Sequence, residues 1–306
     1  MGEIRLSWVH IALAAAAVTG LVSISDKTVM YRYARSPLTL PLLIGFAQTI
    51  VGLVSLGLSG IPLEATIQLS ASAVLSGILF GLSGILHQRV LFTQEVSRTI
   101  PVMQSSPIFA ALLSMAVLRE SVSSLQWAGI IGTVVGSVLI SLQTRSGVRR
   151  VFLSRSFYVL MLSAFLFGAA NVIGKIAVDG LPILYTHGLR MLALGCIFLV
   201  FTFRRAPWED VKGFLRTRSP ALLFVSTNEF ITANIGLLML LWALSVGPVS
   251  LVTALMGTRA LFVVFYSTAL ALVWKGALGE QTSVGIVATK LISVAIIVIG
   301  VMAIAF

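Results

Sequence analysis

Long apolar runs with almost no internal charge constrain this chain more than any other feature. One of them, WAGIIGTVVGSVLIS (127–141), contains no charged residue, and similar runs recur along all 306 residues. A helix of about 20 apolar residues crosses a bilayer core of about 30 Å. Only 10% of the residues are charged, against about 25% in a soluble domain, so a water-facing surface cannot be covered. The sequence therefore predicts an integral membrane protein.

Ten such runs are predicted as transmembrane helices. A β-barrel is a poor alternative, because barrel strands are about 10 residues long and alternate between two faces, whereas these runs are longer and apolar on both faces. The predicted fold is an all-α membrane protein. The ten predicted spans are residues 8–29, 38–58, 67–91, 96–118, 125–142, 157–178, 182–203, 219–245, 249–273 and 282–304.

The longest polar connection divides these spans into two groups of five. We expect one five-helix unit over 1–142, a basic linker over 143–156 and a second five-helix unit over 157–306. Because each unit has an odd number of spans, the second unit must cross the membrane in the opposite orientation. Inverted repeats of this kind recur in secondary transporters, which bind substrate near the midplane between the repeats. The prediction is two inverted repeats around a central cavity.

Three short matches occur in the same order in both halves and support the repeat. They pair ISDKTVM (24–30) with VIGKIAV (172–178), VSRTIPVM (96–103) with VSLVTALM (249–256), and LRES (118–121) with LGEQ (278–281). The first match places Lys27 on Lys175, and the third places Glu120 on Glu280. Each glutamate is expected to face the N-terminal end of the last helix of its half, where the helix dipole favours a negative charge and nearby Ser and Thr can cap.

Two segments resemble the EamA-type unit of the drug/metabolite transporter superfamily. NVIGKIAVDGLPILYTHGLRMLALG (171–195) resembles the opening helices of that unit, in which a Lys ends one helix and an Arg, here Arg190, lies in the next. VSRTIPVMQSSPIFAALLSMAVLRESVSSLQWAGIIGTVVGSVLIS (96–141) resembles its fourth and fifth helices. The resemblance implies membrane transport of small metabolites.

Two further segments are similar to the sugar-phosphate and nucleotide-sugar branch of that superfamily. They are DKTVMYRYARSPLTLPLLIGFAQTIVG (26–52) and GPVSLVTALMGTRALFVVFYS (247–267). This similarity implies that a basic residue at the position of Arg259 holds the phosphate of the substrate. A Lys that the branch carries in its fourth helix is replaced here by Met103, which departs from the phosphate-binding pattern.

Polar side chains inside the predicted spans are the candidate substrate site. A Lys or Arg at the centre of a span costs about 2.5–3.5 kcal/mol on insertion scales, so each one requires a partner or a function. More cations than carboxylates lie inside the spans, which suits a phosphate, a carboxylate or a zwitterion, because guanidinium groups bind such groups through paired hydrogen bonds. The candidate substrate-binding residues are Arg190, Arg259, Lys290, His187, Tyr185, Gln104, Asn171, Tyr266 and Trp242.

Three further residues are candidates for coupling or ion pairing. Glu229 is interpreted as the only carboxylate well inside a span, and it either couples transport to a proton or cation or is the fixed partner of one cation. Lys27 and Lys175 end the first helix of each half, so a gating role and snorkelling to the membrane interface both stay open. Snorkelling is also the alternative for Lys290.

The net charge of +11 does not indicate nucleic acid, because the basic residues lie mostly in short connections between apolar runs. Such connections are enriched in Lys and Arg on the cytoplasmic side of a membrane. Connections 5–6 and 7–8 hold four and five basic residues, so we expect them in the cytoplasm and both termini outside. The expected location is the inner membrane if the source is a prokaryote.

Other function classes lack their sequence signatures. Cys196 is the single cysteine and no His-Glu-x-x-His occurs, so no metal or cofactor is expected. No phosphate-binding loop for ATP is present. A membrane-embedded enzyme lacks a catalytic cluster, and a channel lacks rings of repeated polar residues. Gly132-x-x-x-Gly136 predicts a close helix contact, within the unit or with the second subunit of a homodimer.

The predicted function is therefore secondary active export or antiport by alternating access, and not catalysis. The expected substrates are small polar metabolites, zwitterionic or anionic, such as amino acids, with H⁺ as the candidate coupling ion. Exchange of sugar phosphates or nucleotide sugars is the alternative.

Overall fold

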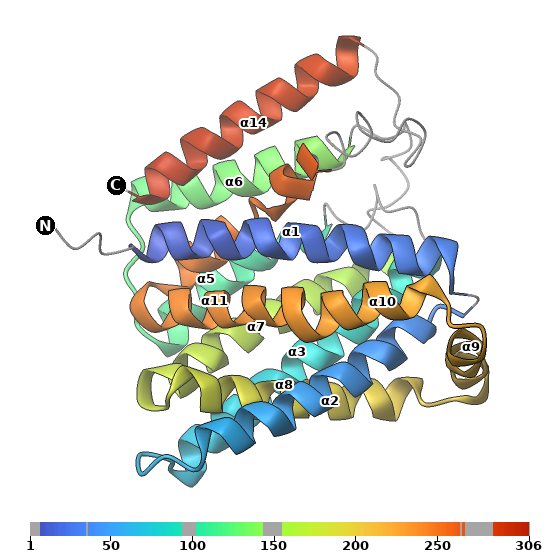
Figure 1. Ribbon diagram of the computed structural model, residues 1–306. Coiled ribbons are helices and arrows are strands. Elements are labelled where there is room, and N and C mark those ends of the chain that lie inside the picture. Colours follow the sequence, from blue (N-terminus) through green and yellow to red (C-terminus); the bar gives the residue numbers. More distant parts are fainter. Residues whose placement is uncertain are drawn as a thin grey trace, which may run out of the picture.

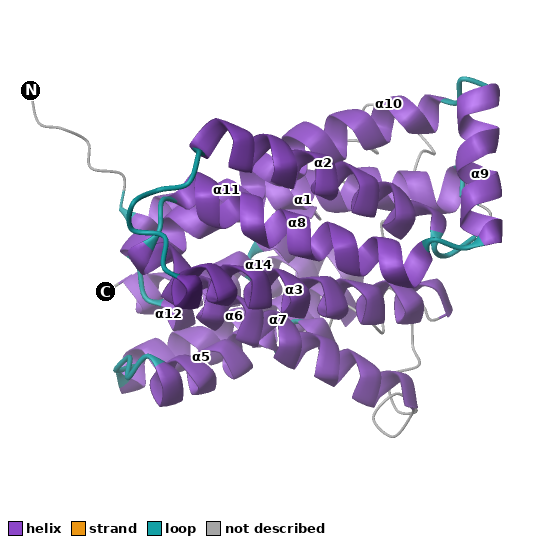
Figure 2. Ribbon diagram, turned by 90° about the horizontal axis from the view of Figure 1, so that it is seen from below, coloured by secondary structure: helices purple, strands orange, loops and turns teal. Residues whose placement is uncertain are grey.

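The computed structural model describes residues 7–34, 36–93, 102–142, 155–263, 265–266 and 284–305. Every regular element in these ranges is a helix, so the all-helical prediction is confirmed for them (Figures 1 and 2). The elements are α1 (Trp8–Arg32), α2 (Thr39–Ser59), α3 (Ile67–Thr93), α5 (Ser106–Val117), α6 (Ser124–Leu142), α7 (Arg155–Gly180), α8 (Ile183–Thr202), α9 (Arg205–Arg216), α10 (Pro220–Thr227), η2 (Asn228–Thr232), α11 (Ala233–Val246), α12 (Val249–Met256) and α14 (Val284–Ala305).

Within the described residues, six helical segments are long and apolar enough to cross a membrane. They are Trp8–Asp26, Thr39–Ser59, Ile67–Val90, Arg155–Gly180, Ile183–Thr202 and Pro220–Val246. Shorter apolar helices are Ser106–Val117, Ser124–Leu139, Val249–Val263 and Ile292–Ile304. Large apolar side chains such as Leu53, Val54 and Ile299 stand outward from these helices, as contact with lipid requires. The chain is a multi-pass membrane protein.

The principal helix contacts join the part of the chain before residue 142 to the part after residue 155. In these contacts α2 packs on α8, α3 on α7 and α8, α1 on α11, α5 on α7 and α12, and α6 on α14. The main core cluster likewise draws side chains from both parts, including Ile11 and Ala111 from the first and Leu244 and Val252 from the second. The two parts therefore share one interior. The beginning of α1 and the end of α14 lie at the same end of the bundle (Figure 1).

Glycines allow the closest of these contacts. A Cβ atom built on Gly52 of α2 would lie 2.6 Å from the backbone nitrogen of Leu192 in α8. On α6, a Cβ atom on Gly136 would lie 3.0 Å from the carbonyl oxygen of Ser293, and one on Gly132 would lie 3.6 Å from the Cα atom of Gly300. The glycine motif of α6 thus packs against α14, which lies in the second predicted unit. The contact is within the chain but between the two predicted units, and the sequence prediction named neither unit-to-unit packing nor this partner.

One helix was not expected. The region of α9 was interpreted as a polar connection, but it forms an amphipathic helix across one end of the bundle (Figures 1 and 2). Pro207, Val211 and Phe214 are its buried residues. Its Asp210 carboxylate accepts hydrogen bonds from the Ser36 backbone N–H (2.9 Å) and the Thr39 hydroxyl (2.7 Å), at the start of α2. These contacts fix α9 to the bundle and satisfy donors at a helix N-terminus.

The expectation for Glu120 requires a correction. Its carboxylate faces α12 rather than the start of its own helix α6, and accepts hydrogen bonds from the backbone N–H groups of Val249 (2.7 Å) and Ser250 (3.2 Å) and from the Ser250 hydroxyl (2.9 Å). The reason is that α6 is capped by Ser123 and Gln126, which bond each other's backbone N–H groups in a capping box. The Glu120 carboxylate therefore stabilises the start of α12, in the second half of the chain. Glu280 lies outside the described residues.

Candidate functional site

Two helices, one in each half of the chain, are interrupted by a short turn. A turn at Gln104–Ser105 separates the helical residues 102–103 from α5, and a turn at Gly257–Thr258 separates α12 from the helical residues 259–263. If the predicted alignment of 96–103 with 249–256 is continued, the two turns fall at equivalent positions of the predicted repeat. They also touch, since Gln104 Nε2 donates to the Gly257 carbonyl oxygen at 3.1 Å. The Ser137 hydroxyl donates to the same oxygen at 3.1 Å.

Arg259 directly follows the second turn. Its side chain is exposed, although the helical segment that carries it begins at the contact between the two interrupted helices. The guanidinium group lies within electrostatic range of Asp26 on α1 and of His87 on α3. Arg259 is thus directed toward side chains from the first half of the chain.

Two carboxyl groups from opposite halves meet beside Arg259. Asn228 Nδ2 donates to Asp26 Oδ1 at 2.8 Å and to Glu229 Oε1 at 2.9 Å, so one amide bridges both carboxyl groups. Because one nitrogen atom contacts both oxygens, the two carboxyl groups lie close together. Glu229 is only 3% exposed and Asn228 only 4%. We call Asp26 and Glu229 the acid pair.

A π-turn, the element η2 between α10 and α11, positions Glu229. The wider turn bonds the Ala233 N–H to the Asn228 carbonyl oxygen, five residues back. The Glu229 carbonyl oxygen instead accepts side-chain amides, from Gln48 Nε2 of α2 at 3.2 Å and from Asn234 Nδ2. Single π-turns inside α-helices occur frequently at functional sites. Here the turn places Asn228 and Glu229 inside the bundle and ties them to α2.

Several buried polar atoms near the acid pair have no hydrogen-bond partner. They include Gln48 Oε1, Asn228 Oδ1 and His187 Nδ1. The other ring nitrogen of His187, Nε2, pairs with Asn234 Oδ1 at 3.0 Å. Most buried polar atoms in proteins are hydrogen-bonded, so unpartnered ones call for an explanation.

A groove with a cavity volume of about 390 Å³ lies on the outer side of this region. His187 and Asn234 line it together with apolar side chains that include Ile50, Phe230 and Ile231. Ile50 and Ile231 are about half exposed and face outward. The lining is mostly apolar, so the groove suits a lipid chain better than a charged substrate.

Arg190 of α8 and Asn171 of α7 form an enclosed pair that is separate from the acid pair. Arg190 is only 1% exposed, its Nη2 donates to Asn171 Oδ1 at 3.1 Å, and its guanidinium lies 5.0 Å from the centre of the Phe80 ring. Tyr185 and His187 on the same helix are also buried. Enclosure by α3, α7 and α8 favours a structural role for Arg190 and Asn171, and a role in binding stays a prediction.

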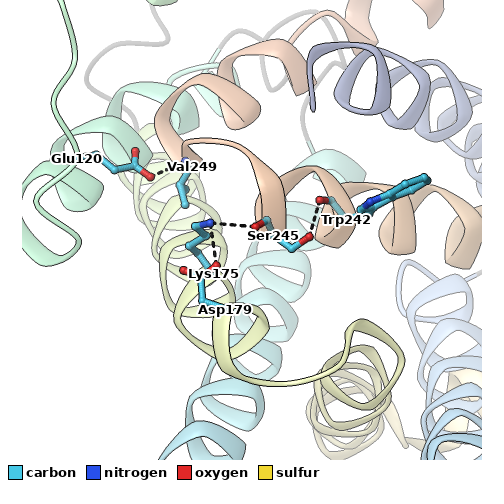
Figure 3. Close-up of polar contacts among 6 residues, drawn as sticks. All are labelled: Glu120, Lys175, Asp179, Trp242, Ser245 and Val249. Carbon is cyan, nitrogen blue, oxygen red and sulfur yellow. Dashed lines mark hydrogen bonds and ion pairs between the residues drawn. The ribbon is translucent and has the colours of Figure 1, made fainter. Parts of the chain in front are cut away.

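Lys175 lies near the end of the bundle where Glu120 meets α12 (Figure 3). Its ammonium group forms an ion pair with Asp179 at 2.8 Å and lies 3.5 Å from the carbonyl oxygen of Ser245. Trp242, predicted as a cavity residue, is 43% exposed, and its ring points away from Lys175 (Figure 3).

The remaining predicted residues divide into two groups. Tyr266 stacks on Phe262, with 6.2 Å between ring centres, and it lies close to Gly20 of α1. The backbones of Lys27 and Lys290 lie in α1 and α14, but their side chains are outside the described set.

The sequence interpretation missed Asp26. It named Glu229 as the only carboxylate well inside a span, although the predicted span 8–29 contains Asp26. A signal was present, because an acid inside a predicted membrane span requires a partner. Gln48, Asn228 and Asn234 were also not predicted as site residues. Among the described residues, no group of three or more His, Cys, Asp or Glu side chains could hold a metal ion.

Comparisons with known proteins support the fold alone. No family model matches the chain, and no curated protein matches it. A solved structure described only as "Crystal structure of protein" is similar, with a TM-score of 0.70 and 16% sequence identity, over 97% of this chain and 94% of that one. At this identity the similarity shows a shared fold along nearly the whole chain.

Proposed function

We propose that this chain is a secondary transporter that moves small zwitterionic metabolites, such as amino acids, by alternating access. The observation that carries the proposal is the placement of opposite charges near each other, with the exposed Arg259 on one side and the acid pair on the other. An amino acid carries a carboxylate and an ammonium group a short distance apart. A guanidinium group binds the carboxylate and carboxyl groups bind the ammonium group, both through charge-assisted hydrogen bonds.

The helix contacts support two inverted five-helix repeats with ten membrane crossings. If the halves are exchanged, the contact of α1 with α11 becomes that of α7 with α3, and the contact of α5 with α7 becomes that of α12 with α1. The exchange leaves three contacts unchanged, namely those of α2 with α8, α5 with α12 and α6 with α14. Each of these contacts is observed. A pseudo-twofold axis in the membrane plane has this consequence.

Interrupted helices at matching positions add to this support. In transporters built from inverted repeats, such interruptions mark the substrate site near the midplane, because they free backbone groups for binding. Here the two turns touch at Gln104 and Gly257, immediately before Arg259. Together with the resemblance to EamA-type units, this supports membership of the drug/metabolite transporter superfamily.

Exchange of sugar phosphates remains the second candidate function. Arg259 favours it, since a guanidinium group binds phosphate as well as carboxylate. The acid pair opposes it, because two carboxyl groups near Arg259 repel a phosphate dianion. Met103, which replaces the expected second cation, also opposes it.

Uptake into proteoliposomes tests the proposal. Vesicles that contain the purified protein are preloaded with unlabelled L-amino acids and then given a labelled mixture of the same compounds. We expect labelled amino acids to accumulate by exchange, and glucose 6-phosphate not to. Arg259→Ala should reduce the uptake at least tenfold, whereas Arg216→Ala, on the exposed face of α9, should leave it unchanged. Uptake of the phosphate alone would establish the second candidate instead.

A further inference from the structure

The acid pair has the geometry of a proton-binding site. Two carboxyl groups that contact the same amide nitrogen repel each other strongly when both are negatively charged. One proton bound to the pair removes this repulsion. Asp26 lies on α1 and Glu229 in η2, so the shared proton also links the two halves of the chain.

The unpartnered acceptors provide an independent indication. Gln48 Oε1 and Asn228 Oδ1 are buried beside Glu229, in side chains only 2% and 4% exposed, and neither oxygen has a donor. Gln48 and Asn228 use their N–H groups on Glu229 and Asp26. The site therefore holds more acceptors than donors. It suits an occupant that brings N–H or O–H groups, such as an added proton or an ammonium group.

Few other charges act on the pair. Arg259 is the charged group that faces it from the segment after α12, and Arg259 also acts on His87 of α3. Among the described side chains, α2, α10, α11 and α12 bring no charged group, and they contribute the amides of Gln48 and Asn234. Within the described part of the chain, the charge balance of the site is therefore set by Asp26, Glu229, Arg259 and the occupant.

The geometry points to competition between a proton and the ammonium group of the substrate for the acid pair, so that the protein exchanges one proton for one zwitterion. This inference rests on the proposed function. When the substrate binds, its ammonium group takes the place of the shared proton, which leaves to the water on the same side. The site with the proton bound has net charge 0: two carboxylates, one proton and Arg259. With a neutral zwitterion bound it has net charge −1, so each exchange moves one positive charge.

Proteoliposomes with a pH-sensitive dye inside test the coupling. A labelled mixture of the twenty standard L-amino acids is added outside, and uptake and internal pH are recorded together. We expect uptake with a rise in internal pH, in a ratio of one proton to one substrate. The N-acetyl derivatives, which lack the ammonium group, should produce no rise.

Two variants assign the proton to the pair. Glu229→Gln and Asp26→Asn should lower both the substrate uptake and the proton movement that accompanies it at least tenfold, because the acid pair binds both in turn, whereas Glu64→Gln, in an exposed loop, should leave both unchanged. A Tm close to that of the unmodified protein and a single peak in size-exclusion chromatography verify that each variant is folded. Uptake by the unmodified protein without a pH change, or full proton movement in both variants, would overturn the coupling and leave the transport function intact. Absence of any uptake would refute both proposals.

Discussion

Two glycines of α2, five positions apart, offer a matched test of how closely α2 approaches α8. A Cβ atom on Gly52 would lie 2.6 Å from the backbone nitrogen of Leu192 and 2.9 Å from the carbonyl oxygen of Gly188. A Cβ atom on Gly57 would meet nothing within 4 Å. Both sites are glycines of α2, but only Gly52 faces the backbone of α8.

The expected magnitudes follow from these distances. Alanine is favoured over glycine in a helix interior by about 0.5–1 kcal/mol, and this gain applies at both sites. At Gly52 the added methyl group also meets backbone atoms, which cannot rotate away as a side chain would. Overpacking of this kind costs about 1–3 kcal/mol. We expect Gly57→Ala to be slightly more stable than the unmodified protein, and Gly52→Ala to be less stable than Gly57→Ala by about 1–3 kcal/mol.

Thermal unfolding of the purified variants in one detergent, followed by tryptophan fluorescence, measures this difference. A change of 1 kcal/mol shifts the Tm of a chain of 150–250 residues by about 2–4 °C, so the two variants should differ by about 2–12 °C. Equal Tm values for the two variants would refute the close crossing of α2 and α8. Gly52→Ala should also slow transport, because α2 carries Gln48 and α8 carries His187.

Three other substitutions test contacts of the fold and the site. Glu120→Ala removes the charged acceptor of three hydrogen bonds at the start of α12 and should lower the free energy of unfolding by about 2–4 kcal/mol in a denaturant titration, whereas the loop variant Glu64→Ala should not. Asp210→Ala removes a cap of α2 and should lower the free energy of unfolding by about 1 kcal/mol. The same substitution should speed proteolysis at α9. Arg190→Met should lower the Tm but leave the KM for transport unchanged, because the guanidinium is enclosed; a raised KM with an unchanged Tm would return Arg190 to the binding site.

The helix positions could be predicted from the sequence because a bilayer allows few backbone conformations. Backbone groups in the hydrocarbon core must be satisfied within the segment, so an apolar run of sufficient length becomes a helix. The predicted spans 38–58 and 182–203 accordingly match α2 and α8 within one residue at each end. The apolar length of a segment determines this result, and no tertiary contact is needed to obtain it.

Features within the helices did not follow from the sequence. The turn at Gly257–Thr258 contains no proline, and the carbonyl group that it frees is satisfied by Gln104 and Ser137, from distant parts of the chain. The π-turn at Glu229 depends in the same way on Gln48 of α2. The amphipathic helix α9 is anchored through Asp210 to residues more than 170 positions earlier. In each case the local backbone depends on a partner that the local sequence does not reveal.

The acid pair likewise could not be located from the local sequence. The predicted repeat, however, identifies the residue in the second half that corresponds to Asp26. The alignment of 24–30 with 172–178 places Gly174 at the position of Asp26. In the proposed repeat, the contact of α7 with α3 corresponds to that of α1 with α11, and a Cβ atom on Gly174 would lie 3.0 Å from Ser76 Oγ. The contact of α7 with α3 is thus tightly packed at this point, whereas Asp26 of α1 shares the amide of Asn228 with Glu229. If the acid pair exchanges a proton for an ammonium group as proposed, its contact separates and reforms during transport. In an inverted-repeat transporter, the packed contact is then expected to act as the fixed element, about which the contact with the acid pair opens.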